Sequence, residues 1–112
     1  MPISKEKADL KKKFGKNPGR IARYLTVSLA NNELEPVLKA LNQILAGQNV
    51  SALARETGIN RNTLYDSFGG KANPSLGRVL ELLRALNVRL VAVPWSPNGG
   101  SSKKSFIDRS RF

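Results

Sequence analysis

The sequence contains no cysteine and no histidine, and these two absences exclude much catalytic and metal-binding chemistry. Such a chain has no thiol nucleophile, no Ser-His-Asp arrangement and none of the usual zinc ligand sets. The eight Asp and Glu residues are scattered, and nothing in their spacing pairs them as a general acid and base. We therefore expect no enzyme, no cofactor and no metal, and the lack of cysteine fits a reducing compartment.

Long apolar runs are missing as well. No run approaches the roughly 18 to 20 residues that span a membrane, and the lysine-rich N-terminus lacks the apolar stretch of a signal peptide. We therefore expect a cytoplasmic protein with no membrane partner. Aromatic residues make up only 6% of the chain, which disfavours an RNA-binding sheet that stacks bases on aromatic side chains.

Positive charge, in contrast, is in excess. The chain of 112 residues is of single-domain length and carries 19 Lys and Arg against eight acidic residues, a net charge of +11. Residues 1–24 contribute +6, residues 25–93 contribute +2 and residues 94–112 contribute +3. The ends are therefore predicted to be basic arms that contact a polyanion, the alternative being tails that only aid solubility.

Helix-start signals predict five helices in the middle of the chain. Asn17 followed by Pro18 begins the first helix, which ends near Asn32. Asn32 with Glu35 three residues later resembles a capping box for the second helix, whose apolar stripe ends at Gly47. Two short helices follow. The fifth begins after Ser75 and is expected to bury Leu76, Val79, Leu80, Leu83 and Leu86.

The most informative pattern is QNVSALARETGINRNTLYDSF at residues 48–68, which predicts two short helices joined by a tight turn. Gly58 is expected to end the first helix with a positive φ, and Asn60 to cap the second. Leu64 and Phe68, four residues apart, then face inward. This is the pattern of a helix-turn-helix, although any two short amphipathic helices around a glycine look similar.

The outward side of the second short helix carries residue types that read bases. Asn can pair with adenine and Arg with guanine in the major groove of double-stranded DNA. Asp66 is expected to form an ion pair with a nearby cation such as Lys71, the alternative being that it accepts a hydrogen bond from a cytosine amino group. The candidate DNA-binding residues are Ser51, Asn60, Arg61, Asn62, Thr63, Tyr65 and Lys71. An interaction module that faces protein, with arms that bind RNA or a membrane surface, is the alternative from another class.

One short strand is predicted near the C-terminus, because polar and apolar residues alternate over a β-branched run that Pro94 stops. An isolated strand leaves backbone groups unpaired, so we expect it to pair with its copy across a twofold axis, giving a homodimer. The predicted dimerisation residues are Arg89, Leu90, Val91, Ala92 and Val93. The domain division is thus a flexible basic arm at 1–15, a DNA-binding domain at 16–93 and a disordered basic tail at 94–112.

The order VLKALNQIL, ALARETGINRNTLY, the Asn73-Pro74 pair and ALNVRL resembles the addiction-module antidote proteins, which are Xre or lambda-repressor-like helix-turn-helix antitoxins. The resemblance covers about residues 20–93. It implies an all-α, five-helix lambda-repressor-like domain, with one short C-terminal strand and flexible basic termini. It also implies a toxin partner similar to the RelE or HigB ribonucleases, and repression of the shared operon from a palindromic operator.

The resemblance places Arg61, Asn62, Thr63 and Tyr65 on the exposed side of the recognition helix, and Ser51 in the first turn of the preceding helix. Two features depart from the family. Val50 stands where many lambda-repressor-like domains have a DNA-contacting Gln, and both termini are basic where such antitoxins often carry acidic segments. A phage- or plasmid-type regulator that acts without a toxin is the runner-up.

Overall fold

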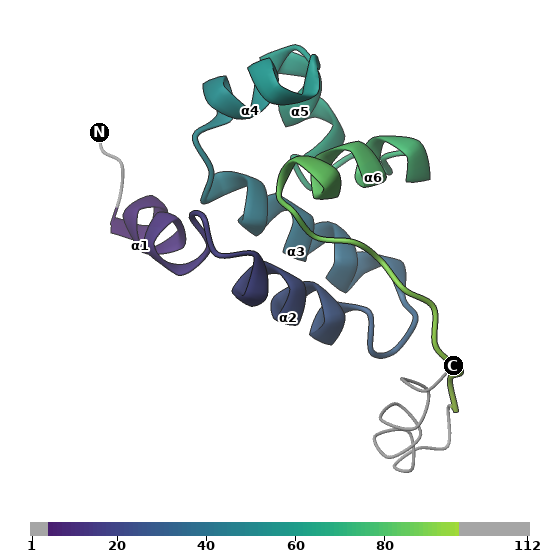
Figure 1. Cartoon of the computed structure of the whole chain (residues 1–112). Helices are drawn as coiled ribbons and strands as arrows, with labels where there is room; N and C mark the ends of the chain where they lie inside the picture. Colours follow the sequence, from purple (N-terminus) through teal and green to yellow (C-terminus); the bar gives the residue numbers. More distant parts are fainter. Residues whose placement is uncertain (1–4, 97–112) are drawn as a thin grey trace.

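The computed structural model describes residues 5–96, with side chains from residue 9, and this part of the chain is built from helices without a strand (Figure 1). The six helices in the described range are α1 (Lys5–Lys13), α2 (Pro18–Ser28), α3 (Leu34–Ala46), α4 (Val50–Thr57), α5 (Arg61–Phe68) and α6 (Leu76–Ala85). The predicted all-α class is confirmed. Among the described residues, no helix has the length and hydropathy that a membrane span requires.

Helix α3 is the centre of the fold, because it contacts α1, α2 and α5. Its wide apolar stripe explains this position: Leu41, Ile44 and Leu45 are all buried. Helix α4 in turn contacts both α5 and α6, so the α4–α5 pair is attached to the body from two sides (Figure 1). The orientation of α5 is therefore fixed by the core.

The predicted starts of α2 and α6 are confirmed by their caps. The Asn17 side chain accepts from the Arg20 N–H at 3.1 Å, and the Ser75 hydroxyl accepts from the Arg78 N–H at 3.1 Å. The predicted capping box before α3 is wrong. Asn32 has a φ of +57° and serves the turn between α2 and α3, because Asn tolerates the left-handed conformation. Helix α3 therefore begins at Leu34, without a side-chain cap.

The N-terminal segment differs from the flexible basic arm that was predicted for residues 1–15. Helix α1 is nine residues long, and Phe14 directly after it is fully buried, with its ring 5.0 Å from that of Tyr24. Gly47 permits this docking, since a Cβ there would lie 2.5 Å from the Leu10 carbonyl oxygen. Only Leu10 and Phe14 anchor this lysine-rich segment to the core. Its composition therefore did not predict the contact.

Helix α6 turns a different face to the core from the one predicted. Leu76 and Leu80 were expected to be buried, but 65% and 45% of their surfaces are exposed. The sequence of α6 contains two overlapping apolar stripes. The stripe with spacing i, i+3, i+4 and i+7 packs on the core because it forms a continuous face along the helix. The inward stripe is half-buried Val79 with buried Leu82, Leu83 and Leu86.

Residues 88–96, here called the C-terminal segment, do not form the predicted strand. The Val88 N–H bonds the Leu83 carbonyl at 2.9 Å, and the Trp95 indole N–H bonds the Ala30 carbonyl at 3.1 Å. Between these anchors, residues 89–94 make no backbone hydrogen bond within the described range. A strand is defined by its ladder partner, and the described part of one chain supplies none. Residues 97–112, in the predicted tail, lie outside the described range.

Candidate nucleic-acid interface

The turn between α4 and α5 has the geometry predicted from its sequence. Gly58 ends α4 with a φ of 76°, in the left-handed region, and its N–H bonds the Ala54 carbonyl at 2.9 Å. Ile59 is buried beneath the turn, and its N–H donates to the Thr57 hydroxyl at 3.1 Å. The N–H groups of Gly58 and Ile59 are thus both partnered, and the buried Ile59 side chain anchors the turn, which restrains the angle between the two helices.

Helix α5 begins and packs as predicted. The Asn60 side chain accepts from the Asn62 N–H at 2.7 Å and so caps the helix. Leu64 and Phe68 are buried beneath it, while Arg61 and Asn62 are exposed in its first turn. The buried pair therefore holds the helix in place while its N-terminal outer side remains available to a ligand.

Tyr65 is exposed and makes a contact that the sequence analysis did not predict. The Arg61 guanidinium carbon lies 5.9 Å from the centre of the Tyr65 ring, one helical turn further along. A cation over an aromatic face is attracted by the ring quadrupole. The contact restrains Arg61 along the outer side of α5.

The other predicted DNA-binding residues differ in how exposed they are. Ser51 is exposed in the first turn of α4 and Lys71 in the loop after α5, whereas Thr63 is half-buried and has less to offer a ligand. Val50 is buried, so its position contributes packing alone. The expected Asp66–Lys71 ion pair is wrong, because neither side chain takes part in a salt bridge within the described residues.

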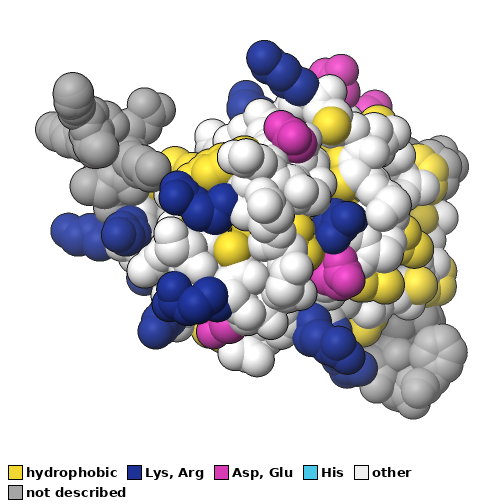
Figure 2. Space-filling view, turned by 90° about the horizontal axis from the view of Figure 1, so that it is seen from above, with side chains coloured by type: hydrophobic (Ala, Val, Ile, Leu, Met, Phe, Trp, Pro, Cys, Tyr) yellow, Lys and Arg dark blue, Asp and Glu magenta, His cyan; other side chains and the backbone are white. Residues whose placement is uncertain are grey.

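Charge on this side of the molecule is mixed, with positive charge in excess. Figure 2 looks down on α4 and α5 and shows dark blue side chains spread over the face, with fewer magenta ones between them. The exposed or half-exposed cations carried by α4, α5, α6 and the loop after α5 are Arg55, Arg61, Lys71, Arg78 and Arg84. Such a surface attracts a polyanion without being uniformly basic.

Helix α1 adds cations at a fixed position beside α3. Lys11, Lys12 and Lys13 form its last turn, and Lys13 lies over the rings of Phe14 and Tyr24 at 5.3 and 5.0 Å. Lys11 and Lys12 are exposed. The lysines that the sequence assigned to a flexible arm are thus partly organised by the core.

Asn42 is a positioning residue that the sequence analysis missed. Its amide N–H donates to the Gly69 carbonyl at 2.6 Å and so ties the end of α5 to α3. Gly70 has a φ of +96°, and a Cβ there would lie 3.1 Å from the Asn42 amide nitrogen. The available signal in the sequence was that two polar residues, Asn42 and Gln43, interrupt the apolar run of α3.

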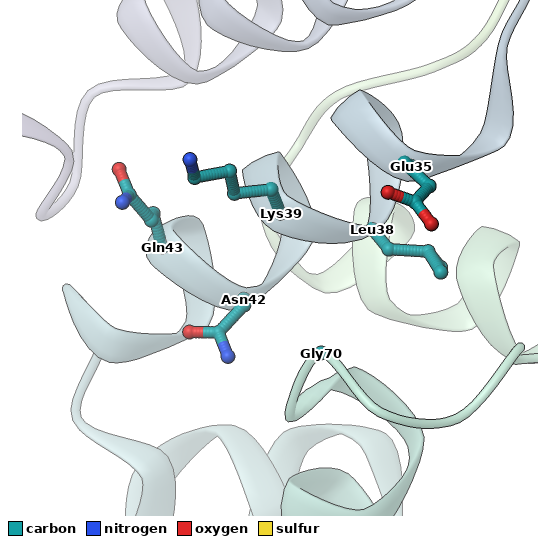
Figure 3. A pocket seen from close by; sticks show the side chains of 6 residues that line it. All are labelled: Glu35, Leu38, Lys39, Asn42, Gln43 and Gly70. Carbon is teal, nitrogen blue, oxygen red and sulfur yellow. The ribbon is translucent and has the colours of Figure 1, made fainter.

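These residues border a shallow hollow of about 420 Å³ (Figure 3). Its lining residues are Glu35, Leu38, Lys39, Asn42, Gln43 and Gly70. A single carboxylate, that of Glu35, faces the hollow, so the hollow contains no pair of carboxylates. No group of three potential metal ligands occurs among the described residues either. The better candidate for a functional site is therefore the exposed surface of α5.

Comparison with known proteins identifies the family. A family model for probable addiction module antidote proteins matches residues 6–94, which include nearly all the described helices and most of the C-terminal segment. An uncharacterized protein of Haemophilus influenzae is 36% identical over 69 residues, which are 62% of this chain and 71% of that protein. No solved structure matches. The chain therefore belongs to the family of probable addiction module antidote proteins, which indicates an antitoxin role and, in general terms, a toxin partner.

Proposed function

We propose that this antitoxin is also a sequence-specific DNA-binding repressor, which acts by binding and not by catalysis. The α4–α5 pair is its helix-turn-helix, and α5 is the recognition helix. The observation that carries the proposal is the outer N-terminal side of α5, where Arg61 and Asn62 are exposed over a buried Leu64. Recognition helices contact base edges mainly through their N-terminal residues.

The chemistry of these side chains supports base reading. Arg61 can donate two hydrogen bonds to guanine, and Asn62 can form a bidentate pair with adenine. Tyr65 favours an Arg61 conformation that lies along the helix, which lowers the entropy lost on binding. Arg61, Asn62 and Tyr65 are therefore the proposed reading set.

Phosphate contacts come from other positions in this proposal. Ser51, exposed in the first turn of α4, stands at the positive end of a helix dipole, where anions are stabilised. Lys71 lies beyond the other end of α5 and supplies a cation. Such contacts set the position on the duplex without carrying sequence information.

Selection from a pool of random duplexes, followed by titration of the enriched sequence, tests the proposal. We expect one enriched sequence, with affinity for it reduced by Arg61→Ala and by Asn62→Ala and affinity for random DNA little changed. Arg23→Ala is the matched control, because it removes one exposed charge from α2, which packs on α3. Equal losses on both duplexes would make Arg61 and Asn62 phosphate contacts, and no enriched sequence would refute the repressor role.

We further propose that the toxin partner is a RelE- or HigB-like ribonuclease, encoded beside this antitoxin in an operon that the antitoxin represses. The resemblance of the residue 20–93 region supports this type of partner, and the matched family implies a toxin in general. Co-expression with the product of the neighbouring gene should suppress its cleavage of messenger RNA. If no neighbouring gene encodes such a toxin, a repressor that acts alone replaces this part of the proposal.

A further inference from the structure

The end of α1, the turn after it and α2 together carry cations without any acidic residue. Between Asp9 and Glu33 the chain has no Asp or Glu. The cations of this stretch are Lys11, Lys12, Lys13, Lys16, Arg20 and Arg23. None of them takes part in a salt bridge within the described residues. The two on α2 are both arginines, and both are exposed.

Arg20 and Arg23 lie on the side of α2 that faces away from α3. Ile21 and Leu25 are buried and mark the inner side, by which α2 packs on α3. Residues 20, 23 and 27 are spaced i, i+3 and i+7, so they share the outer side. Figure 1 places α2 at the bottom of the molecule, with α3 between it and the α4–α5 pair. The outer side of α2 is therefore separate from the proposed recognition surface.

The stability of α2 does not explain the charge of Arg20. Asn17 caps the helix and Pro18 begins it, so Arg20 lies in the first turn, which contains no acidic residue. A cation at this end opposes the helix dipole, which stabilises anions there instead. Contact with an external anionic group is a better explanation for a cation at a position where it lowers helix stability.

Exposed apolar side chains continue the same side of α2 beyond its cations. Val27 is 67% exposed, and Leu34, across the turn between α2 and α3, is 51% exposed. Trp95 is 50% exposed and is held at this turn, because its indole N–H bonds the Ala30 carbonyl at 3.1 Å. Trp and Arg are enriched in protein–protein interfaces, whereas Lys is depleted. This composition favours a protein over a nucleic acid, whose phosphates offer apolar side chains no partner.

We propose that this surface, here called the α2 face and made of Arg20, Arg23, Val27 and Trp95, binds the toxin partner. Charge complementarity requires an acidic surface on the toxin, with carboxylates opposite the two arginines and apolar side chains opposite Val27 and Trp95. The inference rests on the toxin partner of the proposed function, but neither on DNA binding nor on the ribonuclease type. Because α3 separates the α2 face from α5, one antitoxin can hold toxin and DNA at once (Figure 1).

Titration of the full chain with the purified product of the neighbouring gene tests the α2 face. Arg20→Glu with Arg23→Glu should weaken binding by about tenfold or more, because two attractions become repulsions. The helix should tolerate the change, since Glu at residue 20 completes a capping box with Asn17, and circular dichroism checks this.

Arg55→Glu with Arg84→Glu is the matched control, because it changes the net charge equally through exposed residues of α4 and α6. Toxin binding should stay within about twofold of the wild type, since exposed charges beyond a Debye length are largely screened. Equal losses in the two double variants would mean attraction by net charge alone and would overturn the proposal. A wild type that does not bind the product would overturn it as well.

A change at Val27 separates docking from attraction by charge. Val27→Arg adds a cation to the α2 face but removes its apolar contact, so toxin binding should weaken by several-fold. Val27 is mostly exposed, so the helix content should not change. Stronger binding by Val27→Arg would overturn the docking surface.

Trp95 reports directly on the occupant, because it is the chain's one tryptophan. Fluorotryptophan incorporated into the antitoxin alone gives one fluorine NMR resonance, which toxin should shift and the selected duplex should not. An unshifted resonance at saturating toxin would overturn the proposal. A shift with duplex alone would make nucleic acid the occupant, and a shift with antitoxin concentration alone would make it a second copy; both overturn the proposal. Lost DNA binding with intact toxin binding would refute only the repressor role.

Discussion

The α4–α5 pair and the C-terminal segment both have clear sequence patterns, but only the first is satisfied within the described chain. In the pair, Gly58, Asn60 and buried Leu64 each find their partner within the same short stretch or in the core beneath it. In the segment, the alternating residues 89–93 find no ladder. A pattern whose partners are local predicts structure directly, whereas a strand pattern predicts only that a partner is needed.

The largest expected effect is on stability and should separate the two regions. Leu64 is fully buried, so Leu64→Ala should lower the free energy of unfolding by about 2–5 kcal/mol. Val91 is mostly exposed, so Val91→Ala should change the free energy of unfolding of the monomer by no more than about 0.5 kcal/mol. Urea denaturation of dilute protein measures both. A similar loss for both variants would mean that the segment belongs to the monomer's core.

The turn itself allows a smaller, backbone-specific test. Gly58 has a φ of 76° and no atom within 4 Å of where a Cβ would lie, so a substitution there meets strain without a clash. Gly58→Ala should cost about 1–2 kcal/mol of unfolding free energy, the penalty of a left-handed residue with a side chain. Gly58→Asn should cost less, because Asn tolerates this conformation. Equal costs would point to a steric cause.

Much of the helical fold could be predicted because the sequence features that define it, such as caps and turn glycines, act locally. The caps at Asn17, Asn60 and Ser75 and the left-handed Gly58 follow from residue type and spacing. The misses have non-local causes. Helix α6 has two apolar stripes, and its contact with α4 decides which of them faces the core.

The contact of α1 with the body was hidden for a similar reason. It depends on Gly47 at the far end of α3, whose missing side chain makes room for the Leu10 carbonyl. The expected ion pair of Asp66 with Lys71 is absent from the described residues as well, and the loop after α5 is instead tied to another helix by the Asn42–Gly69 bond. For the candidate site, burial and caps were predicted, while the Arg61–Tyr65 contact was missed although its i, i+4 spacing on one helix is local.

The Arg61–Tyr65 contact should have a modest effect on DNA binding. Tyr65→Ala removes the ring beneath the guanidinium, whereas Tyr65→Phe keeps it. On the selected duplex, Tyr65→Ala should cost about 0.5–1 kcal/mol, the range for an exposed cation–π pair, and Tyr65→Phe should cost less. Titration by fluorescence anisotropy resolves the difference. A full loss in Tyr65→Phe would mean that the hydroxyl, and not the ring, contacts DNA.

The smallest expected effect per residue concerns the cations of α1. Deleting residues 1–13 would remove Leu10 and expose Phe14, so the test must change charge alone. Replacing Lys11 and Lys12 of α1, together with exposed Lys16 in the turn after it, with Gln keeps this packing and leaves Lys13 over its rings.

If these lysines contact phosphates, the triple variant should weaken binding to selected and random duplexes alike. The slope of log affinity against log salt should become shallower by about 0.9 per lost contact. Lys39→Gln, which removes one exposed charge from α3, is the control and should leave the slope unchanged if α3 does not touch DNA. Binding is measured at several salt concentrations on both duplexes. A slope that the triple variant leaves unaltered would assign these three lysines to solubility or to a protein partner, and the affinity for DNA would then rest on α4, α5 and the loop that follows them.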